Sequence, residues 1–252
     1  MKFQFSEQHI EEFQTRGVTV FRGVMPPSLI TDLRRVCEVG RELARARFGR
    51  QTQRLQPIGD FDIDHKPFQD YRELPPLREA INQILGPEFL YGDFRWLGVF
   101  LEPADWPYCM PWHRDARELL TDAEWEKYTR DPRYGNQVNA PLYEDSCTWF
   151  VPGSHIRPDL PREKPFAASD GQMAPAPNFE GKTSEERERI ANDYCQSMPG
   201  AVQLHLNAGD FALYKPWAWH LGSYLPYRKR ATLHDGVFTP ESLDWIPFIK
   251  SK

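Results

Sequence analysis

The chain has 252 residues, a length that suits one large domain or two small ones. Hydrophobic residues make up 40% of it and the net charge is −5, so we expect a sizeable core and neither nucleic acid nor an anionic membrane as the main partner. Its 4 cysteines are scattered without a Cys-x-x-Cys pair, which argues against a zinc site and a disulfide framework. Because no signal-peptide segment or membrane-length apolar run is visible, a cytoplasmic protein is expected, with its oligomeric state left open.

The N-terminal part of the chain, about residues 1–90, is predicted to be mainly helical. Ser6 can cap a first helix and Gly17 can end it. A second helix starts at Pro26-Pro27 and repeats apolar side chains at helical spacing. The predicted elements are a helix over about 7–16, a buried strand over 18–21, a helix from residue 26 and a shorter helix over 77–85.

After residue 90 the pattern changes to short apolar segments punctuated by Pro and Gly, which is typical of a β-sandwich or jelly roll. The fold class is therefore predicted to be mainly β with flanking helices. Polar residues at about 157–199 interrupt the strands and contain one expected helix over 183–194. Because insertions of this length are often functional, we predict a lid-like segment within a single domain of residues 1–252. The expected strands include 94–101, 201–206 and 211–215.

One short segment, Trp112-His113-Arg114-Asp115, carries the strongest chemical signal. On a β-strand, residues i and i+2 point to the same face, so His113 and Asp115 can bind one ion while Arg114 faces away. A distant histidine, His220, could supply a third ligand. Two histidines and one carboxylate form the facial triad that binds non-heme Fe(II) and leaves coordination positions open. Alone, His-x-Asp is a weak motif, because a surface histidine paired with a carboxylate gives the same sequence.

Further segments follow in a recognisable order. Residues 13–24 join a helix to a strand, residues 148–155 end in Val-Pro-Gly-Ser-His, and residues 208–210 are Ala-Gly-Asp, followed by His220 and then residues 230–233. Together with the His-x-Asp segment, this order resembles the phytanoyl-CoA dioxygenase superfamily of Fe(II)- and 2-oxoglutarate-dependent oxygenases. The resemblance implies a double-stranded β-helix core of the jelly-roll, cupin-like type. It also implies Fe(II), 2-oxoglutarate as cosubstrate and O₂, with His113, Asp115 and His220 as the catalytic metal ligands.

In that family, an arginine a few residues past the second histidine binds the distal carboxylate of 2-oxoglutarate. A guanidinium fork suits this task because it meets a carboxylate with two parallel hydrogen bonds. Arg228 and Arg230 are both candidates, and Arg230 is preferred because an apolar strand follows it directly. The family often places polar cosubstrate contacts on the strand that carries Gln137 and Asn139, so these are cofactor-binding candidates too. Lys215 is a weaker one.

The remaining histidines have simpler explanations than metal binding. His155 is expected to shape a turn, and His65 to lie in a surface loop. His205 could lie in the core or in a pocket. His234 and Asp235 are adjacent on a predicted strand, so they face opposite sides and cannot easily share an ion.

The resemblance implies an oxidoreductase, a dioxygenase that hydroxylates, desaturates or cyclises an unactivated C–H bond of a small to mid-sized organic molecule. Aromatic residues around the motifs favour an apolar or cyclic small-molecule substrate, as in specialised biosynthesis. Because residue 115 is Asp rather than Gly or Ala, no chlorination is expected. Two alternatives stay open, namely a 2-oxoglutarate-independent cupin-type metalloenzyme and a non-catalytic jelly-roll binding protein. The aromatic residues are Trp106, Tyr108, Trp112, Trp149, Phe150, Trp217 and Trp219.

Overall fold

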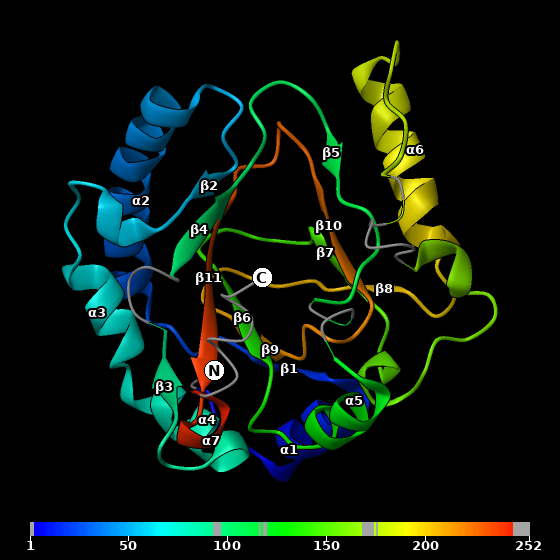
Figure 1. Ribbon diagram of the computed structural model, residues 1–252. Helices are drawn as coiled ribbons and strands as arrows, with labels where there is room; N and C mark the ends of the chain where they lie inside the picture. The colour runs from blue at the N-terminus through cyan, green and yellow to red at the C-terminus, as the bar shows by residue number, and fades with distance from the viewer. Residues whose placement is uncertain are drawn as a thin grey trace.

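In the computed structural model, two antiparallel β-sheets face each other and helices cover their outer faces (Figure 1). The structure describes residues 3–92, 97–115, 117, 120–167, 174 and 176–243. The strands of the larger sheet are β1 (Val18–Phe21), β2 (Arg54–Leu55), β3 (Leu90–Tyr91), β4 (Gly98–Leu101), β6 (Asn136–Pro141), β9 (Phe211–Tyr214) and β11 (Ala231–Phe238). Those of the smaller sheet are β5 (Tyr108–Cys109), β7 (Thr148–Phe150), β8 (Val202–Gln203) and β10 (His220–Tyr224).

The strand order is that of a two-layer jelly roll. The larger sheet runs β1-β9-β6-β11-β4-β2, with β3 paired to β11, and the smaller sheet runs β5-β10-β7-β8. Neighbours in these sheets are rarely consecutive in sequence, so the chain crosses repeatedly between the layers. This confirms the predicted mainly β core with flanking helices, and the two sheets do not close into a barrel.

The helices pack mostly against the outer face of the larger sheet. Leu33 and Ile81, from two of these helices, join one core cluster with Val138 of β6 and Leu233 of β11. Since side chains alternate along a strand, the residues next to Val138 and Leu233 face the smaller sheet instead. The helices are α1 (Glu7–Arg16), α2 (Pro27–Phe48), α3 (Lys66–Arg72), α4 (Pro75–Leu85), α5 (Asp122–Thr129), α6 (Ser184–Ser197) and α7 (Pro240–Leu243), with 3₁₀ turns at Ile58–Asp60, Ser154–Ile156 and Lys164–Phe166.

The local signals in the sequence predicted several of these elements closely. α1 has the predicted bounds, and Gly17 ends it at φ 78°. α4 begins two residues before the predicted start, and α6 extends three residues past the predicted end. α3 and α5 were not predicted. Of the predicted strand 94–101, the structure gives β4 from Gly98, while residues 94–96 lie outside the described part of the chain.

The predicted insertion, 157–199, supplies α6 on the outer face of the smaller sheet. Ala191 of α6 packs in one apolar cluster with Trp149 and Leu221, which are cross-strand partners on β7 and β10. His220 precedes Leu221 on β10 and therefore points to the opposite side of the sheet. α6 thus covers the side away from His220, and the function of the insertion as a lid stays a prediction.

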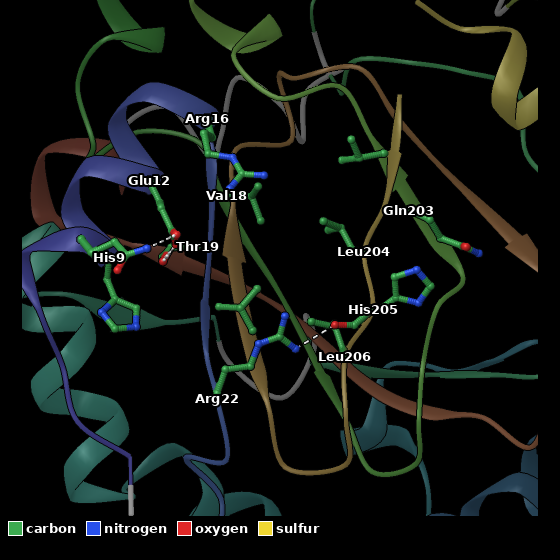
Figure 2. Close-up of a pocket in the computed structure, with 13 residues that line it drawn as sticks. His9, Glu12, Arg16, Val18, Thr19, Arg22, Gln203, Leu204, His205 and Leu206 are labelled. Carbon is green, nitrogen blue, oxygen red and sulfur yellow. Dashed lines mark hydrogen bonds between the residues drawn. The ribbon is translucent and has the colours of Figure 1, made fainter. Parts of the chain in front are cut away.

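The sandwich has two open edges, where the last strands of the two sheets approach each other. Along one edge, β1 and β8 border a groove of about 450 Å³. Figure 2 shows Arg22 reaching across this groove, where its Nη1 donates to the carbonyl oxygen of His205 at 2.7 Å. At the other edge, β2 and β5 border a second pocket. Within the described ranges, every helix is too short or too polar to span a lipid bilayer.

Candidate active site

The two predicted metal-binding histidines lie opposite each other on paired segments of the smaller sheet. β10 begins at His220, and His113 forms an isolated bridge with it beyond the end of β5. The backbone amide of each histidine donates to the carbonyl oxygen of the other, at 3.1 and 3.0 Å. Their ring centroids are 4.3 Å apart. Antiparallel pairing therefore brings together two side chains that are far apart in the sequence.

Asp115 completes the set, as the i, i+2 spacing predicts. Its backbone amide donates to the carbonyl oxygen of Pro216 at 2.9 Å, which holds this segment against the chain that leads to β10. Its Oδ1 lies 3.4 Å from Nε2 of His113 and 3.9 Å from Nε2 of His220. One ligand atom from each of the three residues lies within 4.8 Å of the others. A single ion can therefore contact all three.

Backbone carbonyls determine which nitrogen of each imidazole faces the site. Nδ1 of His113 lies 2.8 Å from the Pro111 oxygen, and Nδ1 of His220 lies 2.9 Å from the Ala218 oxygen. A carbonyl oxygen can only accept, so each Nδ1 carries the proton and each Nε2 presents a lone pair. Burial, and next the proximity of His113, lower the pKa of His220 to about 4, which keeps that ring neutral. Two neutral imidazoles and one carboxylate fit the donor set of non-heme Fe(II).

Gln137 reaches the site from β6, but both ends of its amide contact protein. Its Nε2 donates to Oδ2 of Asp115 at 2.7 Å, and the hydroxyl of Tyr214 donates to its Oε1 at 3.0 Å. The amide therefore contacts the carboxylate of Asp115 directly. Tyr214 was not among the predicted residues. It faces Gln137 across the β6–β9 pair, a register that the sequence does not reveal.

Asn139 lies on the same face of β6, two residues further on. Its Nδ2 donates to Oγ1 of Thr148 at 3.2 Å, and its Oδ1 lies 3.0 Å from Nδ1 of His234. Thr148 belongs to the smaller sheet, so Asn139 links the two layers in the interior of the sandwich. Its amide thus lines the interior between the sheets with its polar atoms already engaged.

Arg228 and Arg230 have very different environments. Arg228 is exposed, and its Nη1 donates to Oγ of Ser146 at 3.1 Å. Arg230 is only 3% exposed, and its Nε donates to Oδ2 of Asp145 at 2.8 Å. The hydroxyl of Thr232 donates to the same oxygen. The ion pair engages Nε of Arg230, and the Tyr224 side chain also interacts with the guanidinium group.

Arg230 also lines the pocket of about 340 Å³ between β2 and β5. Tyr224, Tyr108 and Phe100 supply its aromatic walls, and Arg54 lies at the β2 side. The guanidinium carbons of Arg54 and Arg230 lie 4.6 and 5.1 Å from the centre of the Phe100 ring. The pocket therefore combines aromatic surface with two cationic groups.

Of the aromatic residues predicted as pocket walls, Tyr108 lines this pocket and most of the others belong to the core. Trp112, Trp149 and Trp219 pack in the cluster beneath α6, and Trp217 packs against α5. Phe150 lies in a small cluster with Val18, Tyr214 and Ala218, and Trp106 is 49% exposed. Most of the aromatic residues near the motifs therefore belong to the core, and Tyr108 is the member of this set that lines the pocket.

Arg114 faces away from the metal side, as strand alternation predicts, and is buried. Its Nη1 donates to the carbonyl oxygens of Ser154 and Trp217 at 2.6 and 2.9 Å, and its Nη2 pairs with Asp159 at 2.8 Å. The Ser154 hydroxyl in turn accepts the amide of Trp219 at 2.9 Å. The Val-Pro-Gly-Ser-His segment therefore ties the first metal-binding segment to the second. The sequence identified the segment but not this partner.

The four other histidines discussed above take places that their sequence context suggested. His155 is buried in a 3₁₀ turn that follows Gly153 at φ 75°. His65 immediately precedes α3, with its Nε2 3.0 Å from the Ile58 oxygen. His205 is exposed beside the β1–β8 groove and not in the core. His234 faces the interior, whereas its neighbour Asp235 pairs with Arg72 at 2.6 Å on the helical side.

Lys215, the weaker cosubstrate candidate, is committed elsewhere. Its Nζ donates to three backbone carbonyls, those of Asp131, Pro132 and Tyr134, at 3.0, 3.0 and 2.5 Å. Burial lowers its pKa to about 7, although Asp131 opposes the shift. All three of its donors are thus used in holding the chain before β6 against the end of β9.

Comparisons with known proteins agree with this geometry. The family model described as phytanoyl-CoA dioxygenase (PhyH) matches residues 13–223. Among solved structures, AviO1 from Streptomyces viridochromogenes Tue57 is similar with a TM-score of 0.59 and 15% identity, over 93% of this chain and 95% of that one. The non-heme alpha ketoglutarate dependent epimerase SnoN from nogalamycin biosynthesis gives 0.56 and 15%, over 92% and 80%. The carbocyclase SnoK from the same biosynthesis gives 0.55 and 13%, over 94% and 85%. At these identities the structures are informative about the fold alone, and a search of curated proteins finds no match.

Proposed function

Because the chain belongs to the phytanoyl-CoA dioxygenase family of Fe(II)- and 2-oxoglutarate-dependent oxygenases, we propose that it oxidises an unactivated C–H bond of a small to mid-sized organic molecule. The protein is an oxidoreductase that uses Fe(II), 2-oxoglutarate and O₂. Hydroxylation is the outcome we favour, with desaturation or cyclisation as the other outcomes. Family membership argues against both a 2-oxoglutarate-independent metalloenzyme and a non-catalytic binding protein.

The observation that carries the proposal is the convergence of His113, Asp115 and His220 on one point between the sheets. We propose that these three residues hold the iron. The iron, together with 2-oxoglutarate and O₂, supplies the oxidising power, and the cosubstrate leaves as succinate and CO₂. An ion held by these three residues would keep coordination positions open for cosubstrate and O₂.

Arg230 is proposed to bind the distal carboxylate of 2-oxoglutarate. Asp145 accepts from both Nε of Arg230 and the hydroxyl of Thr232, which fixes the Nε end of the guanidinium, and the terminal nitrogens are proposed to meet the cosubstrate carboxylate. The exposed Arg228 lacks this support. Asn139, whose side chain lies in the same interior, is proposed to line the cosubstrate site through the network that it forms with Thr148 and His234.

The substrate is proposed to be a cyclic or largely apolar molecule of specialised metabolism. Phe100, Tyr108 and Tyr224 give the β2–β5 pocket an aromatic lining, which suits flat or apolar ligand surfaces. Two of the structurally similar enzymes belong to nogalamycin biosynthesis, which makes a natural-product pathway a reasonable context.

A cytoplasmic location is proposed from the state of the cysteines. All 4 are free, and the sulfurs of Cys109 and Cys195 lie 3.9 Å apart without a bond. Free cysteines suit a reducing compartment.

The direct test measures succinate formation by the purified protein with Fe(II), 2-oxoglutarate, ascorbate and a panel of cyclic natural-product precursors. Stimulation of succinate release by one compound, together with a product of altered mass, would support the proposal. The Asp115→Ala variant serves as the inactive control. A wild-type protein that binds iron but never converts 2-oxoglutarate would refute it.

A further inference from the structure

We propose that Gln137 and Tyr214 act together as positioning residues that keep Asp115 a one-oxygen metal ligand. This inference rests on the metal site of the proposed function, and it concerns the one ligand of the three that the backbone does not orient. Each histidine is held through a backbone carbonyl at Nδ1, whereas the carboxylate of Asp115 depends on side chains.

The carboxylate of Asp115 is not held in place by packing. Its side chain is 37% exposed, while those of His113 and His220 are 15% and 9% exposed. A short, half-open carboxylate can rotate about its terminal torsion at little cost. Within the described residues, Gln137 is the side chain that donates a hydrogen bond to it, from Nε2 to Oδ2 at 2.7 Å.

The orientation of the Gln137 amide follows from its two partners. An ionised carboxylate can only accept, so Gln137 must present its NH₂ group to Asp115. Its oxygen then faces β9, where the Tyr214 hydroxyl donates to it at 3.0 Å. Gln137 and Tyr214 are directly opposite in the β6–β9 register, so the two sheet strands maintain this contact. The acceptor-only carboxylate excludes the alternative orientation, in which the amide oxygen would face it, and the tyrosine hydroxyl stabilises the remaining one by donating to Oε1.

Tyr214 also supports a second ligand. Its ring packs edge-on against the ring of His220, with centroids 6.0 Å apart. One buried tyrosine therefore contacts His220 through its ring and, by way of Gln137, Asp115 through its hydroxyl. Tyr214 on the larger sheet thus helps to set the distance between His220 and Asp115.

The consequence concerns the number of open coordination positions. Gln137 engages Oδ2, which leaves Oδ1 as the oxygen that faces both Nε2 atoms. Ligation through one oxygen leaves three of six positions free, enough for two donors of 2-oxoglutarate and one for O₂. A carboxylate that turned and bound through both oxygens would occupy one of these positions. Hydrogen-bonded partners of this kind commonly change metal affinity or activity by about 10- to 100-fold.

The test uses Co(II) as the probe, added to the metal-free full-length protein. Gln137→Leu removes the hydrogen bonds and keeps the side-chain size, and Tyr214→Phe removes only the hydroxyl. Gln203→Leu is the matched control, because Gln203 also donates from a strand, to the Ser146 carbonyl at 2.7 Å, but borders the distant β1–β8 groove. Affinity is measured by chelator competition, ligation by the visible absorption spectrum of bound Co(II), and folding by the melting temperature.

We expect Gln137→Leu to weaken Co(II) binding by about 10- to 100-fold and to change the spectrum. Tyr214→Phe should act in the same direction by up to about tenfold, the range of one neutral hydrogen bond. Gln203→Leu should match the wild type. Wild-type affinity and spectrum in Tyr214→Phe would overturn the inference, and that variant decides the question if Gln137→Leu does not fold. A wild-type protein that binds no Co(II) would instead refute the proposed metal site itself.

Discussion

The strongest quantitative prediction concerns Arg230 and the carboxylate that it meets in the protein. The side chains of Arg230 and Asp145 are 4% and 3% exposed, so they form a fully buried ion pair. Removing one member of such a pair leaves an uncompensated charge and costs about 3–5 kcal/mol, whereas removing both is often close to neutral. We therefore predict that Arg230→Leu and Asp145→Leu each destabilise the fold strongly, and that the double variant recovers most of the loss.

This difference allows cosubstrate binding to be separated from folding. The double variant keeps the fold but lacks the fork that is proposed to bind the distal carboxylate of 2-oxoglutarate. A charge-assisted contact of this kind is worth about 1.5–3 kcal/mol, which corresponds to a loss of about 10- to 150-fold in affinity. Arg228→Leu, two residues away and exposed, is the matched control and should bind 2-oxoglutarate like the wild type.

Two measurements decide the matter. Urea unfolding of the four proteins gives the double-mutant cycle for Arg230 and Asp145, and anaerobic calorimetry with Fe(II)-loaded protein gives the affinity for 2-oxoglutarate. An unchanged affinity in the folded double variant, or a loss in Arg228→Leu, would show that the cosubstrate carboxylate binds elsewhere. Destabilisation of the double variant by the sum of the two single effects would contradict the pairing energetics.

Three further outcomes are expected. Replacing any one of the three proposed ligands with alanine (His113→Ala, Asp115→Ala or His220→Ala) should remove bound iron, measured by mass spectrometry of the metal content. The circular dichroism spectrum should stay that of the wild type. A variant that keeps both iron and turnover would show that its residue is not a ligand. Burial alone would raise the pKa of Asp145, but its contacts with Arg230 and next with Thr232 lower it overall. A carboxyl whose pKa is depressed on folding stabilises the protein above its unfolded-state pKa of about 3.9 and loses that contribution as the pH falls through the folded-state value. Unfolding free energies between about pH 7 and pH 3 should thus fall more steeply for the wild type than for the variant lacking Arg230 and Asp145, and parallel curves would count against the pair. Once a substrate is known, turnover under ¹⁸O₂ should give a hydroxylated, labelled product, and a chlorinated product formed with chloride would contradict Asp115 as a ligand.

The parts of the fold that the sequence predicted well depend on local signals. α1 lies between Ser6 and Gly17. The extended backbone of Ser6 begins the helix and the left-handed backbone of Gly17 ends it, so both signals are local. α5 was missed although Thr121 and Glu124 form a capping box, because the helix is only 8 residues long and repeats few apolar positions. His113 and Asp115 could be placed on one face because the alternation of a strand needs no knowledge of its neighbours.

What could not be predicted depends on register between strands that are distant in sequence. Gln137 was predicted as a cosubstrate contact, and its side chain lies on the interior face of its strand. Its partners, Asp115 and Tyr214, come from the chain after β5 and from β9, and a shift of β9 by one residue would turn Tyr214 to the helical side. The family resemblance therefore identified the residue but not what it contacts.

The choice between Arg228 and Arg230 also depends on contacts between segments that are distant in the sequence. Two residues apart, they would share a face if the strand included both, so alternation cannot separate them. β11 begins only at Ala231, which leaves Arg228 in the preceding turn and exposed. Asp145 lies buried at the level of Arg230, and a buried carboxylate needs a cation within reach. The counter-charge on another segment, rather than the spacing from His220, thus selects the arginine that faces the interior.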